Sequence, residues 1–373
     1  MTSRIIYVAN VRMPTERAHG LQIVKMCEAF SSAGAAVTLV VPRRKNLITA
    51  DPFEFYGIPK SFEIRWLPVW DLVSWGYLGY VIEAISFAFA TIRIPVQKTD
   101  ILFTRDIFST LLFSFRTRNV FYEMHNFPRS GLWFWRLTLK RMRGIISTNK
   151  WKADQLILQF GFSKNRIISF PNGFDPTEFV GLSPASFRFS AERPVILYTG
   201  NLFGWKGADI LARAAKILPT YDFVFIGGSP REYEDFRKKF GSYANIHLLG
   251  RRPHNEIPRY LATADILALP NSAQDPESVY STSPIKLFEY MASGKPIVAA
   301  DLPAIREIVS EEEVFFFRPD DPESLAEKMK EVFQNLEFGE GKAKAAKIKV
   351  SQYTWDHRAR AILSFLVRHV STQ

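Results

Sequence analysis

Residues 283–301 read SPIKLFEYMASGKPIVAAD, and this stretch does most to decide the fold. It predicts a loop, a helix, a second loop and a buried strand, in that order. Ser283 suits the N-cap of the helix, and Pro284 suits its first turn. Gly294 ends the helix, and the apolar run 297–300 then predicts the strand.

Three features of this helix should meet near its start. A helix N-terminus attracts anions, Lys286 adds a positive charge, and the carboxylate of Glu289 can accept hydrogen bonds from two sugar hydroxyls. Together they suit a ligand that carries both phosphate groups and a diol. The sequence therefore predicts a binding site for a nucleotide sugar.

Composition indicates a globular protein with an anionic partner. The chain has 373 residues, of which 47% are hydrophobic, and this length suggests two domains. Its single cysteine, Cys27, excludes an internal disulfide, and the N-terminus lacks an apolar signal segment, so a cytoplasmic location is expected. The net charge of +11 favours a nucleotide, an acidic glycan, a phospholipid surface or nucleic acid, and charge alone does not choose between them.

Strand-like apolar runs alternate with helical patterns along the whole chain, which predicts an α/β fold with parallel sheets covered by helices on both faces. Neither half carries the full dinucleotide glycine fingerprint, which disfavours a dehydrogenase. The predicted strands are 4–9, 36–41, 62–67, 100–104, 119–123, 143–148, 166–170, 194–199, 221–227, 244–249, 264–269, 296–300 and 314–317.

The predicted domains are residues 1–175 and 194–352, joined by a linker at 176–193 that is rich in Pro and Ser. A helix at about 353–373 is expected to pack back on the first domain. The apolar segment 72–95 is nearly long enough to span a bilayer, but it carries Glu83 at its centre. We predict a helix that is largely buried in the protein.

Five separated motifs resemble those of the retaining family-4 glycosyltransferases of the GT-B fold, in the expected order. The resemblance implies two Rossmann-like, doubly wound domains that face each other across a cleft. The second would hold a UDP- or GDP-sugar donor and the first the acceptor, with no catalytic metal and no cofactor. The motifs are the His-Gly pair at 19–20, EMHNFP at 123–128, FPNGFDPTEF at 170–179, YTGNLFGWKG at 198–207 and the stretch at 283–301.

In the second domain, Glu289 matches the second glutamate of the family's pair, which implies that it binds the ribose hydroxyls of the donor. In the alternative, structural interpretation, Glu289 forms a surface salt bridge with Lys286. Ser281 stands where the family has its first glutamate, so the identity of the sugar stays open. The start of the helix should present backbone amides to a diphosphate. The residues concerned are Ser283, Pro284, Ile285 and Lys286.

The loop GNLFGWKG at 200–207 is the second predicted phosphate element. Gly200 lets the backbone approach a phosphate, and Lys206 supplies charge. Asn201 stands where the family usually has an arginine, and Arg251 is a candidate to compensate. A generic strand-to-helix turn with a surface lysine is an equally simple interpretation.

In the first domain, the resemblance implies that His125 lines the donor-sugar pocket and that Gly20 faces the diphosphate. Each has a structural alternative, since a histidine can cap a strand end and a glycine can start a helix. Asn172 and Gly173 are interpreted as a structural turn. We predict His125, Lys206 and Glu289 as the catalytic residues of a metal-independent, retaining transfer to a glycan or lipid-linked acceptor.

The segment 129–144, RSGLWFWRLTLKRMRG, interleaves aromatic and basic residues. It is similar to a basic amphipathic helix on an anionic membrane, although an ordinary surface helix fits equally well. Three other interpretations remain: a sugar-nucleotide epimerase of the same fold, a catalytically degenerate binding subunit, and a nucleic-acid binder. No nucleic-acid recognition motif supports the last, so no nucleic-acid partner is expected.

Overall fold

The computed structural model describes residues 4–187, 189–190 and 192–371, and it divides into two compact units. The first unit comprises residues 1–171 and 355–373, and the second comprises residues 172–354. Residues 188 and 191 of the predicted linker and residues 372–373 of the predicted C-terminal helix lie outside the described residues.

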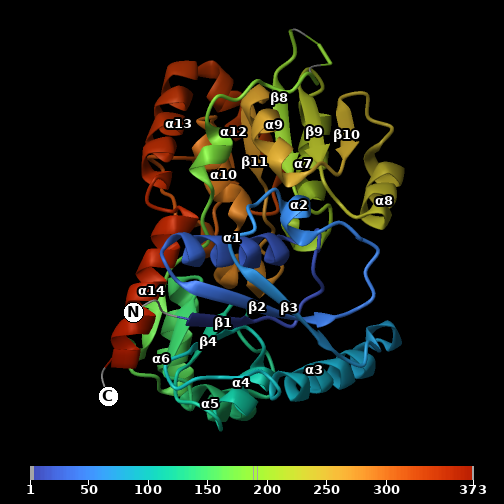
Figure 1. Ribbon diagram of the computed structural model, residues 1–373. Coiled ribbons are helices and arrows are strands. Elements are labelled where there is room, and N and C mark those ends of the chain that lie inside the picture. Colours follow the sequence, from blue (N-terminus) through green and yellow to red (C-terminus); the bar gives the residue numbers. More distant parts are fainter. Residues whose placement is uncertain (1–3, 188, 191, 372–373) are drawn as a thin grey trace. The chain divides into compact units, whose positions relative to one another are not determined.

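The first unit is built on a seven-stranded sheet in the order β3-β2-β1-β4-β5-β6-β7 (Figure 1). All of its strand pairs are parallel. The reversal of strand order beside β1 makes the sheet doubly wound. The strands are β1 Arg4–Val8, β2 Ala36–Arg43, β3 Glu63–Pro68, β4 Ile101–Thr104, β5 Val120–Met124, β6 Gly144–Ser147 and β7 Ile167–Ser169.

Helices cover both faces of this sheet. Figure 1 shows α1 beside α14 on one face, while α3, α4 and α5 follow one another along the other. The helices are α1 Ala18–Ser32, α2 Pro52–Tyr56, α3 Tyr77–Thr91, α4 Ile107–Phe113, α5 Leu132–Lys140, α6 Lys150–Phe160 and α14 Trp355–Ser371, with short 3-10 turns η1 Val73–Trp75 and η2 Lys164–Arg166.

The second unit has a six-stranded parallel sheet in the order β10-β9-β8-β11-β12-β13. Its strands are β8 Val195–Thr199, β9 Asp222–Ile226, β10 Ile246–Gly250, β11 Ile266–Leu269, β12 Ile297–Ala300 and β13 Phe315–Phe317. Its helices are α7 Ala208–Ile217, α8 Pro230–Phe240, α9 Ile257–Thr263, α10 Ile285–Ser293, α11 Pro303–Arg306, α12 Pro322–Gln334 and α13 Leu336–Val350, with short turns η3 Pro176–Phe179, η4 Gly204–Lys206, η5 His254–Glu256 and η6 Glu277–Ser281.

The strands form where the apolar runs predict them, because a parallel strand covered on both faces needs an unbroken apolar sequence. Every residue of β8 and of β12 is buried, for example. All thirteen predicted strands are present, and the prediction of an α/β fold with parallel sheets is confirmed.

The prediction for segment 72–95 is confirmed in part. A helix, α3, is present, but the expectation that it is largely buried is wrong for its outward face, where Leu78 and Phe89 are 67% and 60% exposed. The sheet covers only one side of this helix, so apolar residues on the opposite side face solvent. Within the described residues, no helix combines the length and the apolar character needed to cross a membrane.

Candidate functional site

The carboxyl end of β8 organises the predicted donor site in the second unit. Tyr290, on α10, accepts a hydrogen bond from the backbone nitrogen of Thr199 at 2.9 Å, and its hydroxyl also lies 3.2 Å from Thr199 Oγ1. This contact fixes α10 against the last residue of β8. One turn earlier on the same helix, Lys286 is thereby directed at the loop that follows the strand.

The amine of Lys286 is buried, and it has no hydrogen-bond partner among the residues that the structure describes. It lies 4.0 Å from the centre of the Tyr198 ring, and a Cβ added to Gly200 would come within 2.6 Å of it. Burial and the charge of Lys206 lower the pKa of Lys286 well below its ordinary value. A buried amine without an acceptor is costly, which makes this position suitable for an anion. The alternative of a surface salt bridge with Glu289 does not describe this side chain.

The loop 200–207 depends on glycine at two positions. Gly200 has a φ of +130°, which other residues rarely adopt, and a Cβ at Gly207 would lie 1.6 Å from the carbonyl oxygen of Pro270. Between them, Lys206 is half-buried with its amine 3.8 Å from the centre of the Trp205 ring. Burial lowers the pKa of Lys206 to about 8, although Glu277 partly opposes this.

Asn201 replaces the family's arginine, and Arg251 is the candidate to compensate for it. Asn201 is exposed, and its carbonyl oxygen accepts a hydrogen bond from the Tyr198 hydroxyl at 2.6 Å. Arg251 is exposed and follows β10, an edge strand two places from β8. Because both residues are exposed, neither supplies a buried positive group at the end of β8. Lys286 on α10 supplies the buried amine there.

The start of α10 differs from the predicted cap. Pro284 occupies the N-cap position and Ile285 is the first helical residue, with no capping hydrogen bond from a side chain. Ser283 Oγ instead accepts a hydrogen bond from the backbone nitrogen of Asn172 at 3.0 Å, and the Asn172 amide donates to the Ser283 carbonyl at 2.8 Å. The prediction of Ser283 as N-cap is therefore wrong. The predicted end is confirmed, because Gly294 has a φ of +69°.

Glu289 is 7% exposed and lies next to His254, which the sequence did not single out. His254 Nε2 is 3.2 Å from a carboxylate oxygen of Glu289 and 3.7 Å from one of Glu178. Burial raises the pKa of Glu289, and His254 partly opposes this. No local motif marks His254, because its partner carboxylates are distant in sequence.

Ser281 is 3% exposed and ends η6, the short π-helical turn before α10. Its hydroxyl gives this position hydrogen-bonding capacity but no charge. Among the described residues, no group of three or more His, Cys, Asp and Glu side chains is arranged to hold a metal ion.

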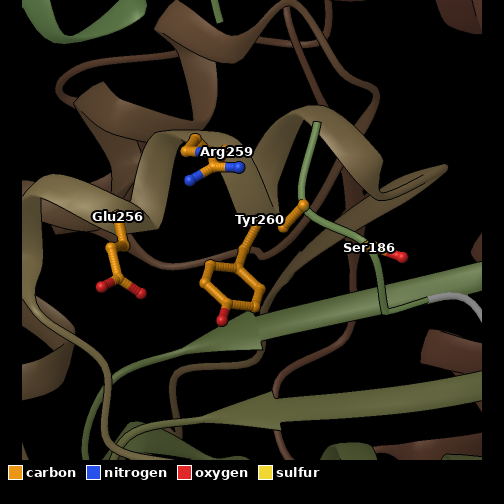
Figure 2. Close-up of a pocket in the computed structure, with 5 residues that line it drawn as sticks. Ser186, Glu256, Arg259 and Tyr260 are labelled. Atoms are coloured by element: carbon orange, nitrogen blue, oxygen red, sulfur yellow. The ribbon is translucent and has the colours of Figure 1, made fainter. Parts of the chain in front are cut away.

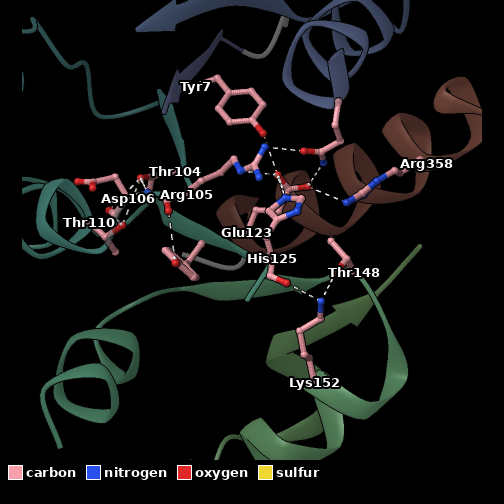
Figure 3. Close-up of polar contacts among 12 residues, drawn as sticks. Tyr7, Thr104, Arg105, Asp106, Thr110, Glu123, His125, Thr148, Lys152 and Arg358 are labelled. Atoms are coloured by element: carbon pink, nitrogen blue, oxygen red, sulfur yellow. Dashed lines mark hydrogen bonds and ion pairs between the residues drawn. The ribbon is translucent and has the colours of Figure 1, made fainter. Parts of the chain in front are cut away.

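In the first unit, the predicted residue His125 follows β5. Figure 3 shows its imidazole against Glu123, with Nε2 2.9 Å from the carboxylate. Burial, reinforced by Arg105, lowers the pKa of His125 to about 3, so the ring is neutral at pH 7. In the neutral ring only one nitrogen carries a proton, so the other can accept a hydrogen bond from a hydroxyl.

Glu123 is fully buried and is held from several sides (Figure 3). Tyr7 donates to it at 2.8 Å and Arg358 donates at 2.7 Å, the latter from α14. Burial alone would raise the pKa of Glu123, but His125, Arg358 and Arg105 hold it below its ordinary value. The sequence motif around 123–128 drew attention to this strand end, whereas nothing local identifies Arg358.

Gly20 lies in the first turn of α1. A Cβ there would come within 2.3 Å of the Tyr56 hydroxyl and 2.4 Å of Thr15 Cγ2. The tyrosine hydroxyl also donates to the Thr15 carbonyl at 2.6 Å. Packing within the first unit therefore already requires a glycine at this position, independently of any ligand.

A separate pocket in the second unit lies between residues 185–186 and α9 (Figure 2). In Figure 2, Tyr260 lies between Glu256 and the segment that carries Ser186. The lining residues are Ala185, Ser186, Glu256, Arg259 and Tyr260. None of them is among the residues predicted from the sequence, and the pocket is distinct from the surroundings of Lys286.

Comparisons with known proteins agree with the predicted family. Residues 193–335 match the family described as "Glycosyl transferases group 1". The sulfoquinovosyl transferase of Arabidopsis thaliana is 27% identical over 168 residues, which are 44% of this chain and 31% of that protein. Two further curated relatives match over 57% and 52% of their own length, so the chain spans at most about three-fifths of these relatives.

Solved structures agree over the whole fold. Sucrose-phosphate synthase from Thermosynechococcus elongatus has a TM-score of 0.77 at 14% identity, with both chains covered completely. The HepE protein of Anabaena, solved in complex with UDP, has a TM-score of 0.71 at 17% identity and covers 98% of this chain and 100% of its own. The predicted GT-B fold and the resemblance to family-4 glycosyltransferases are confirmed.

Proposed function

We propose that this chain, a GT-B protein similar to the group 1 glycosyltransferases, transfers a sugar from a nucleotide-sugar donor to a glycan or a lipid-linked acceptor. The donor would be a UDP- or GDP-sugar, and the transfer would retain the anomeric configuration without a metal ion. The observation that carries the proposal is the buried, unpartnered amine of Lys286 beside Gly200. An anion at this position would supply the missing acceptor.

In the proposed donor complex, the diphosphate lies against the first turn of α10 and the loop 200–207. The helix amides, Lys206 and Lys286 surround it with donors, and its charge raises the pKa of both amines. Glu289 accepts hydrogen bonds from the two ribose hydroxyls. His254 lies 3.2 Å from the same carboxylate and would hold it in position for the diol.

In the proposed reaction, the bond between the anomeric carbon and the diphosphate oxygen breaks, and its electron pair stays on the diphosphate. The acceptor oxygen bonds to the same carbon from the same face, and the acceptor proton passes to the released diphosphate. Lys206 and Lys286 stabilise the charge that develops on this leaving group. The resemblance assigns Gly20 and His125 to the donor from the first unit, and a neutral His125 could accept a hydrogen bond from a sugar hydroxyl.

Segment 129–144 bears on where the acceptor lies. The aromatic and basic residues of segment 129–144 support peripheral association with an anionic membrane, which would bring a lipid-linked acceptor within reach. On α5, Trp133 is 74% exposed, which agrees with such a role. Trp135 instead packs within the unit, with its ring 5.9 Å from that of Tyr122.

A catalytically inactive, nucleotide-sugar-binding subunit is the second candidate. Ser281 favours it, because a hydroxyl stands there in place of the family's carboxylate. The two candidates differ in one measurement, the release of nucleoside diphosphate from UDP- and GDP-sugars. An active transferase releases it with at least one donor, whereas the inactive subunit binds the donor and releases none.

Thermal unfolding with UDP, GDP and ADP tests the site itself. A nucleotide that binds the native protein raises the unfolding temperature, and above the dissociation constant the rise grows with the logarithm of the nucleotide concentration. We expect UDP or GDP to raise the unfolding temperature and Lys286→Met to reduce the rise at the same nucleotide concentration. Lys344→Met, which removes an exposed lysine from α13, is the matched control and should respond as the wild type does. Absence of any rise with all three nucleotides would contradict the proposal.

A further inference from the structure

Helix α3 presents an apolar row to solvent. Its members recur at positions 78, 85, 89 and 92, a spacing that places them on one side of a helix. They are 67%, 40%, 60% and 42% exposed. The only charged residue of the helix, Glu83, is buried and accepts a hydrogen bond from Arg44 at 2.8 Å. The outward face of α3 therefore carries no charge. The row consists of Leu78, Ile85, Phe89 and Ile92.

The neighbouring helices extend this surface. Arg116, after α4, donates to the carbonyl of Ile94 at 2.9 Å, which joins the end of α4 to the end of α3. Arg141, after α5, lies 4.3 Å from the centre of the exposed Phe115 ring and donates to Ser114 at 2.8 Å. Figure 1 shows the three helices following one another on one face of the sheet. We call this surface the α3–α5 face, made by residues 72–141.

Charge is distributed unevenly along this part of the chain. Within the α3–α5 face, residues 72–141, all of which the structure describes, every acidic side chain is buried: Glu83, Asp100, Asp106 and Glu123. The exposed charges in the same range are all basic: Arg93, Lys98, Arg116, Arg118, Arg129, Arg136, Lys140 and Arg141. An apolar row is thus accompanied only by positive charge.

We infer that the α3–α5 face docks on an anionic lipid bilayer, with α3 lying in the interface and its apolar row in contact with the acyl chains. The fifteen residues of α3 rise about 22 Å, which is less than the roughly 30 Å of a hydrocarbon core, so the helix lies on the membrane and does not span it. The inference extends the membrane association proposed for 129–144 and makes α3 its main apolar element.

Charge complementarity identifies the bilayer as the occupant. A second copy of the same face would oppose basic residues to basic residues, which disfavours self-association. Anionic headgroups match the positive residues, and the acyl region matches the apolar row. Arg116 bonds to Ile94 just after α3 and Arg141 stacks on the exposed Phe115, so positive charge lies beside the apolar surface, as interfacial binding requires.

Sedimentation of the full chain with vesicles tests this inference. We expect binding to phosphatidylglycerol–phosphatidylcholine vesicles at low salt and at least tenfold weaker binding to pure phosphatidylcholine. Leu78→Asn with Phe89→Asn should weaken binding about tenfold or more, since each removes apolar surface from the interface. The matched control, Leu336→Asn with Ile348→Asn, alters exposed apolar residues of the second unit and should leave binding unchanged.

The charge contribution has its own pair of variants. Arg136→Glu with Lys140→Glu should weaken binding about tenfold and reduce its salt dependence. Lys238→Glu with Lys239→Glu, on α8 of the second unit, removes the same charge elsewhere and should have a smaller effect. Circular dichroism and the nucleotide-induced thermal shift establish that each variant is folded.

Three outcomes would overturn the inference: no binding of the wild type to anionic vesicles at low salt, equal losses in the α3 variant and its control, or a lipid-free dimer that the α3 variant dissociates. If a variant does not fold, quenching of the wild type's tryptophan fluorescence by brominated lipid decides the question, because Trp75 and Trp133 are exposed in this part of the chain. Absence of quenching would contradict the inference. Release of nucleoside diphosphate without vesicles is measured in parallel, so a failure of the proposed transferase function is distinguished from a failure of membrane docking.

Discussion

The two units place buried ionisable groups at equivalent ends of their parallel sheets, but they treat them in opposite ways. At the end of β5, the carboxylate of Glu123 is surrounded by Tyr7, Arg358 and His125. At the end of β8, the amine of Lys286 has no hydrogen-bond partner in the described part of the chain. A buried charge that is paired within the protein stabilises the fold or positions a neighbouring side chain. A buried amine without an acceptor indicates that a ligand supplies one.

Removing a partner of Glu123 tests the first half of this contrast and should have the largest effect. Arg358→Met leaves the buried carboxylate without its main cation, and we expect the free energy of unfolding of the first unit to fall by about 3–5 kcal/mol. Urea unfolding measures this change. Arg360→Met on the same helix breaks an exposed pair with Asp356 and should cost less than about 1 kcal/mol. Equal effects of the two variants would contradict this account of Glu123.

Removing the groups that would contact the donor tests the second half. Glu289→Ala and Lys206→Ala should each reduce transfer by about 10²–10³-fold or more, because each removes a contact to the nucleotide or to the leaving diphosphate. Circular dichroism should show an intact fold. Ser281→Ala is the matched comparison and should have a milder effect, since the carboxylate is already absent there. Near-normal turnover in either of the first two variants would mean that the site is misplaced.

Lys286→Met separates binding from stability. We expect UDP or GDP to bind about 10–100-fold more weakly, which is the loss of one charge-assisted hydrogen bond. The free energy of unfolding should stay the same or increase, because the variant no longer buries an unpaired amine. Calorimetric titration and urea unfolding measure the two quantities. A large loss of stability would show that the amine is structural.

The pH dependence of nucleotide binding should show the smallest effect. Lys206 has a pKa lowered to about 8 in the free protein, and that of Lys286 is also lowered. A bound diphosphate raises both, so binding takes up protons, and the affinity should fall severalfold as the pH rises through about 8. Titrations in buffers of different ionisation enthalpy measure the proton uptake. Binding that strengthens with pH in this range would contradict the roles of both lysines.

The sequence predicted the scaffold well and the site in part. Parallel strands buried on both faces leave continuous apolar runs, which is why all thirteen strands could be located. Glu289, Lys206 and Lys286 could be named because the motifs that contain them are local. His254 and Arg358 could not be named, since their importance arises from partners far away in the chain.

Two predictions failed for the same physical reason. Ser283 was assigned as an N-cap from its position in sequence, but its hydroxyl is used by Asn172, which lies more than a hundred residues earlier. The segment around α3 was expected to be largely buried from its apolar composition, but the sheet covers only one side of it. In both cases tertiary contacts, which a local sequence pattern does not specify, determined the hydrogen-bond partner of the side chain or the burial of the helix.

The position of Arg358 has a consequence for how the protein is made. Residues 1–171 leave the ribosome long before α14, yet the buried carboxylate of Glu123 at the end of β5 receives its principal cation from that helix. During synthesis, the first unit would therefore stay incompletely stabilised while the second unit can already form its own core. Its maturation should wait until α14 has been synthesised, the reverse of the order in which the two sheets are translated.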